Sequence, residues 1–479
     1  MLADNSRALD RMFHPSSIAV IGASSRVSEN GWVRRLLDFG YKGNIYPINP
    51  KVTEIRGMKA YPSVRDVPNA IEYAILNVPA HLVPQAMREC VEKGIKFVHC
   101  FAAGFSETGT DEGRRLQAEI TKIAVDGGVR LIGPNCMGVY CPESRMTFGE
   151  DFPTEKGRIA LISQSGAEAS RLIFLCHDVN LYFSKAVNYG NAADLDAPEL
   201  LEYLVQDTET DIIALYIEGV KNYPRFISAV KQCMKKKPVI ILKAGLTKNG
   251  ADVAAFHTAS ITGAKAVWDA LFKETGAIPA LTMDEVADII QGLARIKKLQ
   301  GRRVAIIGRG GGIGVVATDI CERAGLIVPP FSPETHRKLL QIRSDAGAML
   351  RNPVEPKLGM EGAADFYLKG LPIIDQDTET DIILVQMAVD IHGGHKPDLL
   401  QDVSAAAYAL CATAESIKKP IAVALFTGGH IDTITAVTAA REILTKTGTP
   451  VFSGVEAAAR SLSKIYNYCR FLNSKISGG

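Results

Sequence analysis

A chain of 479 residues is too long for one ordinary domain, and about three are expected. Its 47% hydrophobic and 22% charged residues are typical of a soluble globular protein, and a net charge of +2 gives no reason to expect a nucleic-acid partner. The nine cysteines never form a Cys-x-x-Cys pair, and neither a signal peptide nor a membrane-length apolar run is present. A cytoplasmic protein with no membrane partner, no disulfide framework and no metal site of its own is expected.

Short segments rich in Ile and Val recur through the first 150 residues, each followed by a Gly or Ser turn and a helical pattern. Because strands that alternate with helices build parallel sheets, residues 1–150 are predicted to form one Rossmann-like domain. The segments are SIAVIGAS (17–24), AIEYAILNVPA (70–80), IKFVHCFAAG (95–104) and VRLIGPN (129–135).

The first of these strands places Gly22 in a turn before a helix, where main-chain N–H groups receive phosphates. The turn lacks the second and third glycines of the dinucleotide fingerprint. The second strand ends in Asn49, Pro50 and Lys51, not in the Asp or Glu that an NAD ribose needs. A cation at Lys51 suits the 3′-phosphate of coenzyme A. Two alternatives stay open, namely an ordinary loop lysine and an NAD site.

The rest of the chain contains an internal duplication. Residues 151–298 and 299–479 are therefore predicted to be two flavodoxin-like domains, joined through polar segments. Chance resemblance between two α/β domains is the alternative. Three matches occur in the same order: GRIALISQSGAEASRL (157–172) with GRRVAIIGRGGGIGVVATD (301–319), QDTETDIIALYIE (206–218) with QDTETDIILVQMA (376–388), and KKKPVIILKAG (235–245) with KKPIAVALFTGG (418–429).

The first copy carries two chemical groups that the second lacks. Glu218 corresponds to Ala388, and the segment around His257 has no counterpart. A neutral histidine ring is a good phosphoryl acceptor, and a carboxylate bonded to one ring nitrogen leaves the other free to attack. The alternatives are a structural ion pair at Glu218 and a surface histidine at 257.

Each copy also carries a small-residue turn between its first strand and first helix. In the first copy Ser163, Ser165 and Gly166 can direct N–H groups and hydroxyls at an anion, with help from the helix dipole. In the second copy GRGGGIG (308–314) offers a similar cradle. Ser and Gly also cap helices without any ligand, which is the alternative.

In combination these motifs resemble the α subunit of ADP-forming acyl-CoA synthetases, in the succinyl-CoA synthetase superfamily. The resemblance covers nearly the whole chain, with its motifs in the family's order. They are FHPSSIAVIGASS (13–25), GFSETG (104–109), GPNCMGV (133–139), SQSG (163–166), GNAADLD (190–196), FHTASITG (256–263), RGGGIGV (309–315) and NPVEP (352–356). Phe256 before the histidine and KLGMEG after NPVEP depart from the usual pattern.

The resemblance implies a CoA-binding Rossmann-like domain followed by two flavodoxin-like ligase domains. It also implies a role for each matching residue. His257 would be phosphorylated, Glu218 would steady it, and Asn135 would lie near the reacting acyl group. Ser163, Gln164, Ser165 and Gly166 would hold one phosphate, and Gly310, Gly311 and Gly312 another. The CoA site would be lined by Gly22, Ala23, Ser24, Ser25, Lys51, Val78 and Pro79.

The implied reaction interconverts acyl-CoA, ADP and phosphate with a carboxylic acid, ATP and CoA, through an acyl phosphate and a phosphohistidine. ATP or ADP and Mg²⁺ would be held mainly by a β-type ATP-grasp subunit, in an α₂β₂ assembly. No Walker-type loop for the nucleotide occurs in the chain. The alternatives are a CoA- or nucleotide-binding regulatory protein and a nucleotide-independent acyl-CoA transferase.

Overall fold

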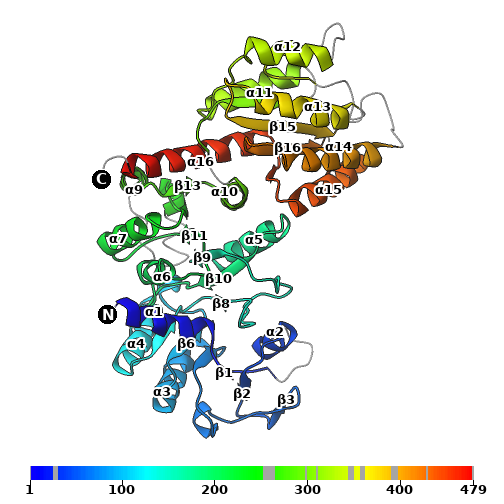
Figure 1. Ribbon diagram of the computed structural model, residues 1–479. Coiled ribbons are helices and arrows are strands. Elements are labelled where there is room, and N and C mark those ends of the chain that lie inside the picture. Colours follow the sequence, from blue (N-terminus) through cyan, green and yellow to red (C-terminus); the bar gives the residue numbers. More distant parts are fainter. Residues whose placement is uncertain are drawn as a thin grey trace. The chain divides into compact units, whose positions relative to one another are not determined.

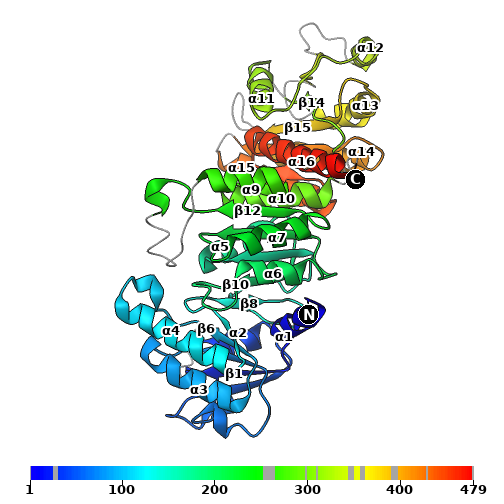
Figure 2. The same ribbon diagram turned by 90° about the vertical axis from the view of Figure 1, so that its left-hand side faces the viewer.

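The computed structural model describes residues 2–24, 31–251, 265–296, 299–308, 311–342, 350–355, 362–389, 398–427 and 430–476. The chain divides into two compact units, and Figures 1 and 2 label their elements. The first unit comprises residues 1–177 and 181–286, and the second comprises 178–180 and 287–479. No helix in the described ranges combines the length and apolar character needed to cross a bilayer.

The first sheet belongs to the first unit and has the order β2-β1-β5-β6-β7, with all strands parallel. Helices α3 and α4 lie side by side on one face, and α2 lies on the other (Figure 1). The elements are α1 (Leu2–Phe13), β1 (Ser17–Ile21), α2 (Trp32–Asp38), β2 (Asn44–Ile48), a hairpin of β3 (Glu54–Ile55) and β4 (Met58–Lys59), β5 (Tyr73–Leu76), α3 (Val83–Lys93), β6 (Phe97–Cys100), α4 (Asp111–Asp126) and β7 (Arg130–Ile132).

The second sheet, in the same unit, has the order β13-β12-β11-β9-β10-β8. It is parallel except for β8, which runs antiparallel to β10 although it falls within predicted residues 1–150. Helices α6, α7 and α9 pack in succession (Figure 1). The elements are β8 (Gly138–Tyr140), β9 (Ile159–Ser163), α5 (Gly166–His177), β10 (Phe183–Asn188), α6 (Ala197–Leu204), β11 (Ile212–Ile217), α7 (Tyr223–Met234), β12 (Val239–Lys243), α9 (Lys265–Thr275) and β13 (Ile278–Ala280). Helix α10 (Met283–Arg295) follows, and its residues from Ala287 onward belong to the second unit.

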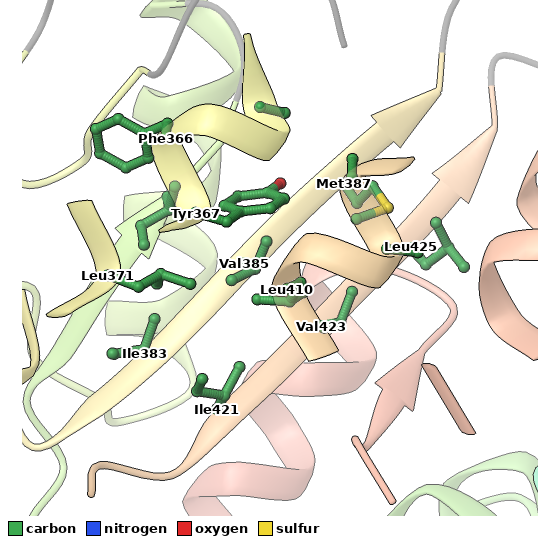
Figure 3. Packing of buried hydrophobic residues seen from close by; sticks show 14 of the residues in the cluster. Phe366, Tyr367, Leu371, Ile383, Val385, Met387, Leu410, Ile421, Val423 and Leu425 are labelled. Carbon is green, nitrogen blue, oxygen red and sulfur yellow. The ribbon is translucent and has the colours of Figure 1, made fainter. Parts of the chain in front are cut away.

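The third sheet forms the second unit and has the parallel order β14-β15-β16-β17. Helices α12 to α15 cover one face, where alternate residues of β15 and β16 build the core shown in Figure 3, and α11 and α16 cover the other. The elements are β14 (Val304–Ile307), α11 (Gly311–Arg323), α12 (Pro333–Ile342), α13 (Ala363–Asp375), β15 (Ile382–Val389), α14 (Leu399–Ala414), β16 (Ile421–Thr427), α15 (Ile431–Lys446), β17 (Val451–Phe452) and α16 (Val455–Ile476).

The second and third sheets repeat one another. Strands β9, β11, β12 and β13 of one follow the same spatial order as β14, β15, β16 and β17 of the other. An ion pair recurs at the same place, between Arg158 and Asp211 and between Arg303 and Asp381, each with a 2.7 Å contact. The predicted α/β class of parallel-sheet domains is confirmed, and the two copies agree in topology and register.

Candidate active site

A cavity of about 750 Å³ lies in the first unit, where the carboxyl ends of strands from two sheets come together. Residues 77–79, 101–103 and 135–137 reach it from β5, β6 and β7, while residues 164–167 and Asn188 reach it from β9 and β10. Open α/β sheets bind ligands at this edge because loops and helix N-termini converge there. The cavity therefore brings together Val78, Pro79, Asn135, Gln164, Ser165 and Gly166 from the predicted site.

The predicted CoA loop after β1 is held close to its neighbouring strands. Gly22 has φ +84°, and a Cβ there would lie 2.2 Å from the Asn77 carbonyl oxygen, so only glycine fits. The Asn49 amide donates to the Ala23 carbonyl at 2.8 Å, and Asn49 Oδ1 accepts the N–H of Lys51 at 2.8 Å. Asn49 thus holds the loop by hydrogen bonds, at the position where an NAD site needs a carboxylate to bind the ribose. Lys51 lies two residues further on and is exposed.

Asn135 is presented by a left-handed turn at the end of β7. Its φ is +55°, its N–H donates to the Ala102 carbonyl at 3.0 Å, and its amide reaches Asn191 Oδ1 at 3.4 Å. Asn191 in turn donates to Glu107 at 2.5 Å, which links the GFSETG and GNAADLD motifs. These bonds fix the Asn135 loop at the cavity.

The Asn135 loop also contacts His99, a buried residue of β6. His99 Nε2 lies 2.9 Å from the Cys136 carbonyl oxygen. Complete burial lowers the pKa of His99 to about 4, so its ring is neutral at physiological pH. A neutral ring can donate one N–H to this carbonyl, and it thereby holds the main chain of Cys136, which lines the cavity.

The Ser-Gln-Ser-Gly turn ends β9 and starts α5. The Ser163 hydroxyl donates to the Ser165 carbonyl at 2.7 Å, and the Ser165 hydroxyl accepts the N–H of Glu168 at 3.3 Å. A Cβ at Gly166 would lie 2.4 Å from Met137 Cγ, so the absence of a side chain permits the close approach of the two loops. The N-terminus of α5 consequently opens on the cavity beside Asn135, as an anion site requires.

Asn188 forms hydrogen bonds to both the Asn135 loop and the phosphate turn. Its Oδ1 accepts the N–H of Met137 at 2.5 Å, and its Nδ2 donates to the Ser163 carbonyl at 2.9 Å. The side chain is buried, so both bonds are shielded from water. Asn188 therefore sets the separation between the Asn135 loop and the phosphate turn.

Glu218 follows β11 and is buried, with 3% of its surface exposed. Gln164 Oε1 accepts its N–H at 2.6 Å and that of Gly219 at 3.0 Å, while the Tyr216 hydroxyl donates to Glu218 Oε1 at 3.3 Å. Burial raises the pKa of Tyr216 well above its usual value, and the Glu218 carboxylate adds to the shift. Gln164 thus connects the phosphate turn to the strand end that carries Glu218.

The remaining predicted residues are placed as follows. Ala23 and Ser24 follow β1, and Ser163 is the buried last residue of β9, directly before the cavity residues Gln164 and Ser165. Gly311 and Gly312 begin α11 in the second unit, where an added Cβ would meet no atom within 4 Å. Ser25, His257 and Gly310 lie outside the described residues.

One cluster in the described ranges has a donor set that a metal could use. Donor atoms of His14, Glu143 and Glu209 lie within 4.8 Å of one another. Lys156 already pairs with both carboxylates, at 3.0 Å from Glu143 and in short contact with Glu209. The pKa of His14 is raised to about 9, so its ring is protonated, and together with the Lys156 ammonium it balances both carboxylates. We therefore assign no metal to the cluster.

Sequence reasoning missed several cavity residues. Phe101, Ala102 and Ala103 follow β6, Met137 lies beyond Asn135, and Asn188 ends β10. The rule that ligands bind at the carboxyl ends of parallel strands could have found the residues after β6 and β10. Contact between Met137 and Gly166 has no local sequence signal, because it depends on how two sheets meet.

A dinucleotide-type domain whose strand ends share a cavity with a flavodoxin-like domain defines a protein of the CoA-ligase class. Family models agree: residues 16–142 match the CoA binding domain, and residues 156–293 match the succinyl-CoA ligase like flavodoxin domain. The α subunit of ADP-forming acetate–CoA ligase II from Pyrococcus furiosus is 34% identical over 98% of this chain and 100% of its own. The chain belongs to the family of ADP-forming acyl-CoA synthetases.

Two further relatives extend the comparison. The structure of dinucleotide-forming acetyl-coenzyme A synthetase 1 from Ca. Korarchaeum cryptofilum, in complex with phosphate and ADP, has a TM-score of 0.83. It is 31% identical and covers 98% of each chain. ADP-forming 4-hydroxybutyrate–CoA ligase of Nitrosopumilus maritimus is 33% identical over 74% of this chain, which spans half of that longer protein. Relatives with similar sequences thus bear the names of different acyl groups.

Proposed function

We propose that this chain is the α-type subunit of an ADP-forming acyl-CoA synthetase. One observation carries the proposal: the Asn135 loop of the first sheet and the N-terminus of α5 open on one cavity. Gln164 joins that cavity to Glu218. An acyl group carried by CoA and a phosphate held at a helix N-terminus would meet there, as acyl phosphate formation requires.

In this proposal the reaction proceeds in three steps. A phosphate oxygen attacks the thioester carbon, and the CoA thiolate leaves to give an acyl phosphate. A ring nitrogen of His257 then takes the phosphoryl group, and a carboxylate leaves. Finally an oxygen of ADP takes the phosphoryl group from the histidine to form ATP. This chain supplies positioning through Asn135 and Glu218, and anion stabilisation at the α5 N-terminus.

The nucleotide steps require a partner in this proposal. Names of the form "subunit alpha" among the relatives support a second subunit. We infer that it is of the ATP-grasp type, holds ADP or ATP with Mg²⁺, and assembles as α₂β₂. We propose domain bounds of 1–150, 151–298 and 299–479. None of the nine cysteines forms a disulfide, which favours a cytoplasmic location.

Labelling with acetyl phosphate tests this function. The wild-type chain should acquire one phosphoryl group through an acid-labile, base-stable bond, with mass spectrometry placing it on His257. A regulatory CoA-binding protein or a nucleotide-independent transferase would remain unlabelled. Absence of label from a folded, CoA-binding chain, both with acetyl phosphate and with a panel of other acyl phosphates, would reject the proposal.

Lys51 provides a separate test of the CoA site. Lys51→Ala should raise KM for CoA roughly ten- to a hundredfold, since losing a charged hydrogen bond costs about 1.5–3 kcal/mol. KM for dephospho-CoA should hardly change, because that ligand lacks the 3′-phosphate. Lys42→Ala, which removes an exposed lysine before the same strand, is the control. Equal effects on both ligands would place Lys51 away from the 3′-phosphate.

A further inference from the structure

Two buried lysines lie at opposite ends of β12, and the ammonium group of each donates to two main-chain carbonyls. Lys237, just before the strand, donates to the carbonyls of Leu204, at 2.6 Å, and Asp207. Lys243, its last residue, donates to the carbonyls of Glu218, at 2.8 Å, and Ala244. A buried ammonium group is costly unless such bonds satisfy it, so each lysine needs a reason to be there.

The duplicated domain shows which lysine serves the fold. Lys237 corresponds to Lys419, which donates in the same way to Ile374, at 2.8 Å, and Asp377, at 2.5 Å. Both copies therefore keep a lysine at the amino end of this strand. A structural role in the α/β unit accounts for that pair.

The lysine at the carboxyl end is found only in the first copy. Lys243 pairs with Ile217 across the sheet, and the equivalent pair in the second copy is Leu425 with Met387. Leu425 lies in the apolar layer above β16 (Figure 3). The same fold therefore accommodates a leucine at the position equivalent to Lys243. A buried ammonium group is not needed there to form the domain.

Lys243 occurs together with Glu218, whose counterpart is Ala388. Its ammonium bonds the Glu218 main chain and lies 5.4 Å from the centre of the buried Trp268 ring in α9. Burial lowers the pKa of Lys243 to about 8, and the Glu218 carboxylate opposes that shift. The two charged residues are thus coupled, in the copy that carries His257.

We infer that Lys243 is a positioning residue for phosphoryl transfer, which fixes the main chain at Glu218 and so directs its carboxylate. The inference rests on the proposed function, because it assigns Lys243 to the Glu218–His257 step. Lys243 acts through Glu218 and contacts no reacting atom.

Acetyl phosphate labelling of matched variants separates this role from a structural one. Lys243→Met and Lys237→Met each remove a buried ammonium that donates to two main-chain carbonyls, so both should lower Tm. Only Lys243→Met should slow phosphorylation, by roughly 10- to 100-fold, whereas Lys237→Met should stay within about threefold of wild type. Equal labelling rates in the two variants would overturn the inference.

A double-mutant cycle adds a test of coupling. In a Glu218→Gln background, Lys243→Met should slow labelling by less than about threefold, because its effect passes through the missing carboxylate. Multiplicative effects would overturn the inference. Should Lys243→Met fail to fold, Lys243→Arg and Lys243→Gln replace it, with only the glutamine variant expected to be slow. An unlabelled wild type rejects the proposed function, whereas a normally labelled Lys243→Met rejects only this inference.

Discussion

His257→Ala should abolish phosphoryl labelling, and Glu218→Gln should slow it by about 10²- to 10⁴-fold. A carboxylate bonded to one ring nitrogen of a histidine fixes its tautomer and stabilises the charge that forms during transfer. Glutamine keeps the shape of Glu218 and its main-chain bonds to Gln164, but it loses the charge. The defect should therefore appear in the rate of transfer, with CoA affinity unchanged.

Rapid-quench labelling with acetyl phosphate measures both variants. Glu202→Gln is a suitable control, because Glu202 forms a partly exposed pair with Arg225 at 2.7 Å. That variant should be labelled at the wild-type rate. Label on His257→Ala would disprove the assignment of the histidine, and a normal rate for Glu218→Gln would disprove the role of the carboxylate.

The chain by itself should bind CoA yet show no acid-dependent consumption of ATP, and an ATP-grasp partner should restore turnover. The physical reason is that no Walker-type loop occurs in the sequence, and that CoA and phosphate occupy the cavity of the first unit in the proposed reaction. The expected change is from no measurable rate to full activity.

Calorimetry with CoA and a coupled ATP assay, each with and without the partner, measure this dependence. Native mass spectrometry should show an α₂β₂ complex in the active mixture. His257→Ala mixed with the same partner is the control, and it should assemble without turnover. Robust ADP-coupled turnover by this polypeptide alone would contradict the need for a partner.

The sequence by itself determined the local pattern of this protein. Apolar segments of four to eight residues followed by small-residue turns predicted the parallel sheets, because each strand and its turn are encoded in consecutive residues. The repeat of QDTETDII at residues 206–213 and 376–383 indicates two related domains, and their comparison singles out Glu218 and His257. These inferences need no knowledge of which strands are neighbours.

Tertiary structure alone decided how the site is assembled. Asn188 reaches both Met137 and Ser163, and Gln164 accepts hydrogen bonds from Glu218 and Gly219. Such contacts join residues 25 to 55 positions apart in sequence, and they depend on strand order and register. In the sequence Lys243 is an ordinary strand residue. The strand register pairs it with Ile217, and its ammonium then reaches the Glu218 carbonyl. Periodicity gives the face on which a side chain lies, but only the packed sheets determine its partner.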